Sequence, residues 1–299
     1  MHHVLTLMFA PGFMRNGPVH TALIVGGGAA LVCAAVGVFT VMRGQSFAGH
    51  ALADVASAGG SAALLLGISP LAGFLGISAL AGGAMEWADV RDARERDLVT
   101  GVTLGVGLGL TALFLYFDTV FRSTSGAAVT VLFGSLFTIP ASIVPVALGV
   151  AVAALLAIGA VYRPLLVSAL SEDLAQAQGV RVRLTALVHA LALALAVSLS
   201  AMTVGAILST ALLIGPAATA LRLADRPGRA LALAVLIGLA ATWGGILLAY
   251  DSFYWTPGHG WPVSFFIVLL IFIAYLFAHL AVRVHGTFHA WWTCRPAGG

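Results

Sequence analysis

The chain has 299 residues, of which 61% are hydrophobic and 8% charged, and its mean hydropathy is +1.05. A soluble domain carries about 25% charged residues, so this composition excludes an ordinary soluble protein and indicates a membrane protein that crosses the bilayer many times. All 14 basic residues are arginine and the formal net charge is +3, which excludes the lysine-dependent P-loop of an ATPase and gives no sign of a nucleic-acid partner.

Apolar runs of membrane-spanning length follow one another along most of the chain. One span needs about 20 mostly apolar residues, and two longer runs divide at Pro70 and near Thr203. We therefore expect an all-α fold, a polytopic membrane helical bundle of about nine transmembrane helices (about 8–10). The transmembrane domain, 19–284, lies between an N-terminal segment, 1–18, and a C-terminal tail, 285–299. The expected spans are 19–42, 46–68, 70–86, 98–117, 141–162, 184–202, 203–222, 229–250 and 262–284.

Arginines in alternate loops predict which side of the membrane each loop faces. The positive-inside rule places these loops in the cytoplasm, which leaves the N-terminus outside and the C-terminus inside. The intervening outer loops hold Asp118 and Asp251, and we expect Asp251 to face water. The arginines in or beside the cytoplasmic loops are Arg43, Arg91, Arg94, Arg96, Arg163, Arg181, Arg183, Arg222, Arg226, Arg229 and Arg283.

Two polar residues lie within the second expected span. In the stretch GHALADV, His50 and Asp54 are four residues apart, so their side chains share one face of a helix. A rise of about 1.5 Å per residue from the cytoplasmic surface puts His50 about 9 Å deep and Asp54 about 15 Å deep. Charged groups at such depth tend to mark ion pathways, and this pair offers Zn²⁺ or Mn²⁺ a weak transit site. The same spacing also fits a His–Asp hydrogen bond that only fixes helix packing.

The loop stretch SEDLAQAQG, 171–179, predicts a short cytoplasmic helix. Ser171 suits its N-cap, two acidic residues suit its first turn, and a glycine suits its end. We interpret this helix as a docking element that offers an apolar residue and an alanine to a partner, although a plain connector would share these features. The residues of this predicted element are Glu172, Asp173, Leu174, Ala175 and Gly179.

Three further features concern the interior of the bundle. His189 is a single histidine within the sixth span, typical of a packed, hydrogen-bonded residue, and we keep it as a second polar candidate for the pathway. Gly215-Pro216 predicts a helix break that shapes the pathway, because proline removes a backbone donor and transporters use broken helices at binding sites. Glycines repeat every four residues at 101, 105 and 109 and predict a face that packs closely on a neighbour.

Three stretches also carry a family resemblance, which covers most of the chain and is densest from Leu174 to Leu248. They are DLAQAQGV (173–180), the run VGAILSTALLIGPAATA (204–220), and the FG-L pattern of Phe133, Gly134 and Leu136. These motifs resemble those of the permease subunits of bacterial ABC transporters for zinc, manganese and iron.

The second span departs from that family in one respect. The family usually shows Asp first and His four residues later, whereas this chain has His50 before Asp54. An i, i+4 pair tolerates this exchange, so the presence of both ligand types favours the metal interpretation. The exchange leaves the metal preference open.

The resemblance implies partners and a location. Segment 171–179 would be the coupling helix that fits a groove on an ATP-binding cassette ATPase subunit, and that subunit would hold the ATP. The resemblance also implies a second copy of this chain, an extracytoplasmic metal-binding protein, and the inner membrane of a bacterium. We expect no permanently bound cofactor, since the Zn or Mn ion would be cargo.

The leading hypothesis is a permease without enzymatic activity of its own, which imports Zn²⁺, or else Mn²⁺, by alternating access. One alternative is an ATP-independent channel or secondary carrier for metal ions or another small solute, which would need no docking helix. A second is an intramembrane enzyme such as a metalloprotease, and the chain has no HExxH motif to support it.

Overall fold

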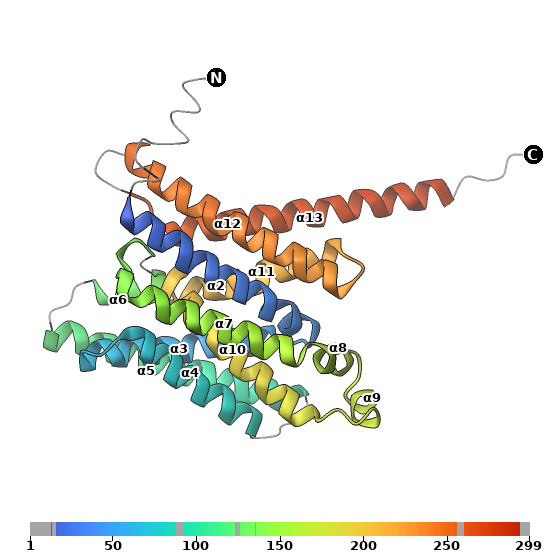
Figure 1. Ribbon diagram of the computed structural model, residues 1–299, viewed down its shortest axis with the longest axis horizontal. Coiled ribbons are helices and arrows are strands. Elements are labelled where there is room, and N and C mark those ends of the chain that lie inside the picture. The colour runs from blue at the N-terminus through green and yellow to red at the C-terminus, as the bar shows by residue number, and fades with distance from the viewer. Residues whose placement is uncertain are drawn as a thin grey trace, which may run out of the picture.

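Nine long helices run side by side as one bundle in the described part of the protein (Figure 1). The computed structural model describes residue 13 and residues 16–87, 93–122, 126–134, 136–255 and 260–293. The long helices are α2 (Gly17–Met42), α3 (Ser46–Leu66), α4 (Pro70–Trp87), α5 (Ala93–Arg122), α7 (Val144–Ala160), α10 (Val182–Val204), α11 (Ala206–Leu223), α12 (Pro227–Trp255) and α13 (Val263–Thr293).

Each of the nine expected spans is thus a helix, but fewer qualify as membrane crossings. Within the described residues, seven helices are long and apolar enough to cross a membrane. The two others are α3, which carries His50 and Asp54, and α4, which carries Glu86 and several glycines. The all-helical bundle is confirmed with about seven candidate crossings, and the expected count of nine crossings stays a prediction.

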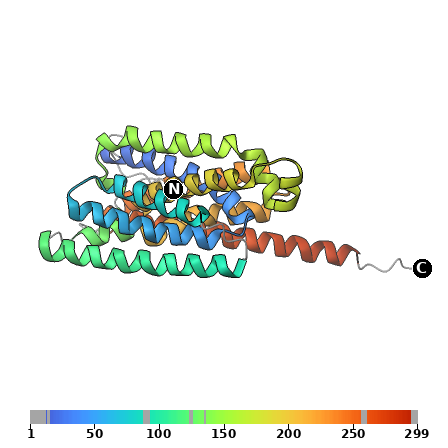
Figure 2. The ribbon, with the colours of Figure 1, turned by 90° about the horizontal axis from the view of Figure 1, so that it is seen from below.

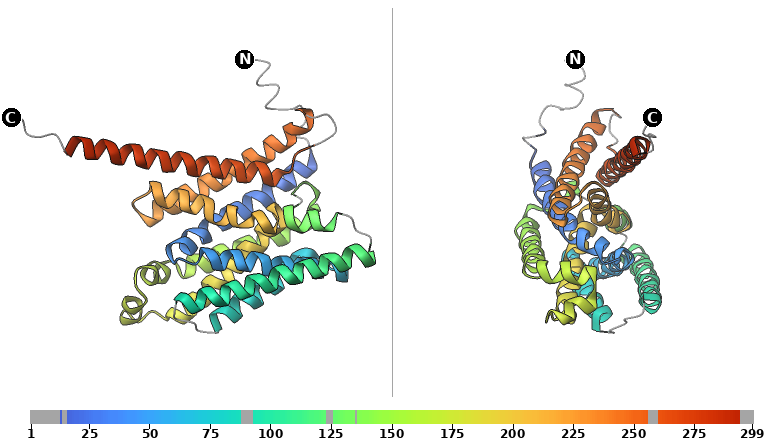
Figure 3. Two further views of the ribbon diagram at one scale, coloured as in Figure 1. Left: turned by 180° about the vertical axis from the view of Figure 1, so that it is seen from behind. Right: turned by 90° about the vertical axis from the view of Figure 1, so that its right-hand side faces the viewer.

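The centre of the bundle consists of α2 and α10. In the most apolar stretch of each, 78% of the residues are buried, against 22% in α5 and α13. Figure 3 shows the other helices packed around this centre. The outer helices expose large apolar side chains such as Val102, Leu156 and Phe277. This is the surface that lipid covers in a membrane bundle.

Two backbone breaks meet inside the bundle. The single residue Gly205, with a φ of 94°, separates α10 from α11. The short helix α6 (Ala127–Phe133) ends at Gly134, with a φ of 76°, and is followed by the 3₁₀ helices η2 (Leu136–Thr138) and η3 (Ala141–Ile143). A Cβ on either glycine would collide with the backbone around the other. Glycine is therefore required on both sides of this contact.

The predicted helix break at Gly215-Pro216 is wrong, since α11 runs unbroken with Pro216 inside it. Proline removes one backbone hydrogen bond, but close neighbours hold the helix on both sides of it. A Cβ on Gly37 of α2 would collide with the Leu213 carbonyl, and a Cβ on Gly238 of α12 would lie 3.7 Å from Pro216 Cγ. The interruption lies at Gly205 instead, close to the division expected near Thr203.

Two short helices, α8 (Tyr162–Leu170) and α9 (Glu172–Ala177), form one end of the bundle (Figure 2). The predicted cap of α9 is confirmed, because the Leu174 N–H donates to Ser171 Oγ over 3.2 Å. The predicted end is confirmed as well: Gly179 has a φ of 77°, and the Val180 N–H donates to the Ala175 carbonyl. The sequence therefore predicts both the place and the capping of this helix.

Both ends of the chain lie largely outside the residues that the structure describes. Most of the N-terminal segment 1–18 and residues 294–299 of the tail lie beyond the described residues. The first part of the expected tail, up to Thr293, continues α13. In Figure 2, α13 extends past the bundle on the side of α8 and α9.

Candidate cation site

His50 and Asp54 lie together on α3, as their spacing predicts. His50 Nε2 is 3.7 Å from Asp54 Oδ2, which is longer than a hydrogen bond. The side chain of His50 is 39% exposed and that of Asp54 is 4% exposed. The imidazole is therefore the accessible member of the pair and the carboxylate is the buried member.

Asp54 Oδ2 is a buried oxygen that makes no hydrogen bond to any described residue. A buried carboxylate oxygen without a partner is costly, and a bound cation would remove that cost. With metal–ligand bonds of about 2.1 Å, a cation that bridges the two atoms would bind them at an angle of about 125°. The pair is a half-site, because no group of three His, Cys, Asp or Glu residues within the described ranges could hold a metal ion.

Helix α5 fixes the backbone of Asp54. A Cβ on Gly107 would lie 2.9 Å from the Asp54 carbonyl carbon, so the two helices touch backbone to backbone. Ser57 Oγ donates to the Asp54 carbonyl oxygen over 2.7 Å, and it lies 2.7 Å from Thr111 Oγ1 of α5. These hydroxyls hold the main chain of Asp54 and leave its Oδ2 for another partner.

His189 lies in a closed environment, away from this pair. It is 1% exposed, and its Nε2 lies 3.4 Å from Thr40 Oγ1 of α2. Thr40 donates its one hydroxyl hydrogen to the Val36 carbonyl over 3.0 Å, so His189 Nε2 is the donor to Thr40. In this state Nε2 has no lone pair for a metal ion, and a role of His189 in the pathway stays a prediction.

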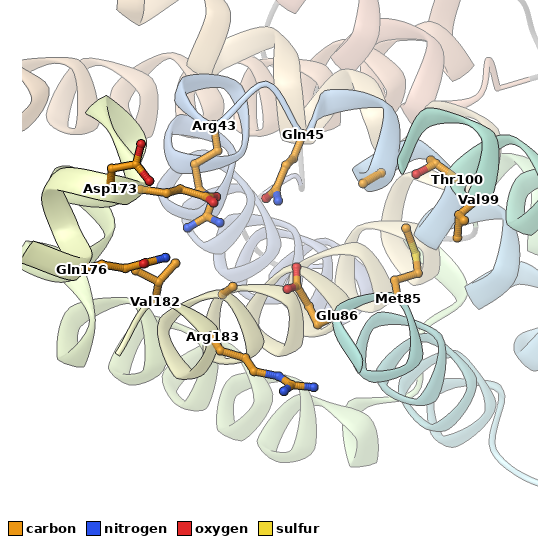
Figure 4. Close-up of a pocket in the computed structure, with 13 residues that line it drawn as sticks. Arg43, Gln45, Met85, Glu86, Val99, Thr100, Asp173, Gln176, Val182 and Arg183 are labelled. Carbon is orange, nitrogen blue, oxygen red and sulfur yellow. The ribbon is translucent and has the colours of Figure 1, made fainter. Parts of the chain in front are cut away.

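A cavity of about 460 Å³ lies at the α9 end of the bundle. Figure 4 shows Arg43 and Gln45 entering it from the turn between α2 and α3, with Asp173 from α9 and Glu86 from the end of α4. The acidic first turn of α9 thus borders an open polar space.

The exposed apolar surface of α9 is smaller than the sequence suggests. Leu174 is 47% exposed, but Ala175 is fully buried, so the expectation that Ala175 is available to a partner is wrong. Arg43 Nη1 donates to Ser168 Oγ over 3.2 Å. This bond joins the turn before α3 to α8, which directly precedes α9.

One site residue, Thr210, was missed from the sequence, and two expected residues lie elsewhere. His50 Nδ1 is 2.8 Å from Thr210 Oγ1 of α11, a contact between residues 160 positions apart that no local pattern indicates. A Cβ on Gly215 would meet Ile271 of α13, and Pro216 lies beside α12. Neither Gly215 nor Pro216 faces the His50–Asp54 pair, and their part in shaping the pathway stays a prediction.

Comparisons with known proteins agree with this architecture. The model of the ABC 3 transport family matches residues 15–281. The manganese import system permease protein ScaB of Streptococcus pneumoniae is 32% identical over 80% of this chain and 82% of its own length. The high-affinity zinc uptake system membrane protein ZnuB of Haemophilus influenzae is 28% identical over 77% of this chain and 88% of its own.

A solved structure shows the same fold. PsaBC from Streptococcus pneumoniae, in complex with Fab, covers 89% of this chain and 92% of that chain, with a TM-score of 0.76 and 28% identity. The resemblance inferred from the sequence motifs is confirmed. The chain belongs to the ABC 3 transport family and is a multi-pass membrane permease of a bacterial ABC importer.

Proposed function

We propose that this permease imports a divalent transition metal, Mn²⁺ or Zn²⁺, with His50 and Asp54 as transient ligands. The observation that carries the proposal is the open pair with a buried carboxylate oxygen that has no hydrogen-bond partner. The names of the relatives support the class of ion, since one is a manganese system and one a zinc system. Their identities of 32% and 28% do not rank the metals, so the order expected from the sequence, Zn²⁺ before Mn²⁺, needs a direct test.

A second copy of this chain would complete the half-site. Two copies that face each other would supply two imidazoles and two carboxylates, the four ligands of a tetrahedral zinc site. The 39% exposure of the His50 side chain supports an open edge that such a partner could approach. An extracytoplasmic binding protein would deliver the ion to the opposite end of the bundle from α9.

Transport would follow from movement of the α9 end. A separate ATPase subunit would hydrolyse ATP and contact Leu174, which is exposed on α9. The resulting displacement of α8 would reach the start of α3 through the hydrogen bond between Ser168 and Arg43. This assignment makes the α9 end cytoplasmic, in agreement with the arginines there, and makes α3 and α4 the remaining two crossings of nine. A weak site suits this cycle because the ion must also leave.

Metal uptake tests the proposal directly. In metal-limited cells that express the complete transporter, His50→Ala and Asp54→Ala should each reduce accumulation of one metal at least about tenfold, since each removes half of the ligands. Elemental mass spectrometry of Zn, Mn and Fe measures the result. Asp251→Ala is the matched control, because Asp251 is equally buried but lies in α12. Accumulation that survives both site variants at normal membrane levels would reject the pair as the site.

Docking of the ATPase separates an ABC importer from an ATP-independent channel or carrier. Leu174→Asp should abolish both uptake and co-purification of the ATPase subunit. Among the described residues, Leu174 is the only large apolar side chain of α9 that is exposed, and the variant replaces it with a charge. Leu98→Asp is the control, since Leu98 is 64% exposed at the start of α5 and off the docking helix. Uptake that continues without a bound ATPase would favour the carrier.

A further inference from the structure

The imidazole of His50 is held from a second helix. Its Nδ1 lies 2.8 Å from Thr210 Oγ1 on α11, while its other nitrogen, Nε2, faces Asp54 Oδ2. The two ring nitrogens therefore have separate surroundings: one hydroxyl on one side and one carboxylate oxygen without a hydrogen bond on the other.

Thr210 differs from other threonines in the bundle. Thr40, Thr111 and Thr219 each donate to the carbonyl four residues earlier in their own helix. A threonine hydroxyl inside a helix commonly makes this hydrogen bond to the backbone. Thr210 makes no such bond within the described residues, where its hydroxyl lies against His50. Thr210 Oγ1 therefore pairs with the imidazole of His50 instead of with a backbone carbonyl of α11.

We infer that Thr210 is a positioning residue of the cation site, which orients His50 so that Nε2 meets the ion. The inference rests on the proposed function of the His50–Asp54 pair. A metal ion binds an imidazole nitrogen without hydrogen, so the remaining hydrogen sits on Nδ1 and is donated to Thr210 Oγ1. In this tautomer Nε2 has its lone pair directed toward the space beside Asp54 Oδ2.

Loss of such a partner lowers metal affinity without removing a ligand. The imidazole of a Thr210→Val variant can rotate or take the other tautomer, and it must then be reordered when the ion binds. Outer partners of metal-bound histidines typically change affinity about 10–100-fold. Valine has nearly the shape of threonine, so the change removes Oγ1 and keeps the packing.

The experiment measures binding of Mn²⁺ and of Zn²⁺ alone to the purified full-length permease in complex with its ATPase. Thr210→Val should raise the Kd of the bound metal about tenfold or more, and Thr210→Ser should return it to near the parent value. Thr219→Val is the matched control on the same helix, because Thr219 Oγ1 bonds the Gly215 carbonyl over 2.7 Å and does not contact His50.

Two further results separate this inference from the proposed function. If His50→Ala removes binding and Thr210→Val binds like the parent, the positioning role is wrong and the site stands. If His50→Ala leaves the Kd unchanged, the proposed site itself is wrong. A Thr210→Val variant that only unfolds at lower temperature, with an unchanged Kd, would show a purely structural contact and overturn the inference.

Discussion

His50 on α3 and His189 on α10 are two imidazoles in neighbouring parts of one helical bundle, with opposite surroundings. The side chain of His50 is 39% exposed, and its Nε2 lies beside a carboxylate oxygen that has no hydrogen bond. His189 is 1% exposed, and its Nε2 lies against Thr40, whose own hydrogen is already donated to the Val36 carbonyl.

The proposed cation site rests on this difference between the two histidines. Both histidines are costly to bury, so depth alone does not separate them. What separates them is the neighbouring oxygen: Asp54 Oδ2 beside His50 makes no hydrogen bond to a described residue, whereas the Thr40 hydroxyl beside His189 donates to Val36. Variants that change the ligands of the open pair, or that remove the closed pair, both test this contrast.

The order of the ligands in the open pair offers the larger effect. Asp54→His would place two imidazoles on α3 and should shift the Zn²⁺-to-Mn²⁺ affinity ratio about tenfold toward Zn²⁺, because imidazole favours zinc and carboxylate favours manganese. His50→Asp should shift the ratio the opposite way. Competition between the two ions for the purified transporter measures both.

The double exchange His50→Asp with Asp54→His restores one ligand of each type in the usual order of the family. It should bind metal with a ratio between those of the two single variants, since an i, i+4 pair presents both side chains on one face in either order. Identical ratios in all three variants would show that this pair does not set the metal preference.

The sequence predicts much of this contrast but not its cause. The spacing of His50 and Asp54 and the capped helix after Ser171 are local patterns, and local patterns survive folding. The contact from His50 to Thr210 joins residues 160 positions apart. It depends on how α3 packs on α11, which hydropathy along one chain does not encode.

Helix packing explains two other differences. The glycines at 101, 105 and 109 have no neighbour within 4 Å of a Cβ, and Gly107 makes the close approach to α3 instead. A repeat of glycines at every fourth residue predicts that a helix packs closely but not which face it uses. Asp118 and Asp251, expected in outer loops, are each 1% exposed within α5 and α12, because both helices run on past the apolar core of the span.

Removal of the closed pair should give the smallest effect. His189→Leu keeps a similar volume and loses the hydrogen bond to Thr40, while Thr40 keeps its bond to Val36. The expected cost is about 0.5–1.5 kcal/mol of stability, seen as a lower unfolding temperature of the purified transporter, with the metal Kd unchanged. Thr40→Val is the companion variant and should cost more, about 1–3 kcal/mol, because it removes the acceptor of a buried His189 nitrogen and leaves the imidazole in place. If His189→Leu abolished uptake while the unfolding temperature stayed at the parent value, the closed pair would belong to the pathway, and the neighbouring oxygen would not be what distinguishes the two histidines.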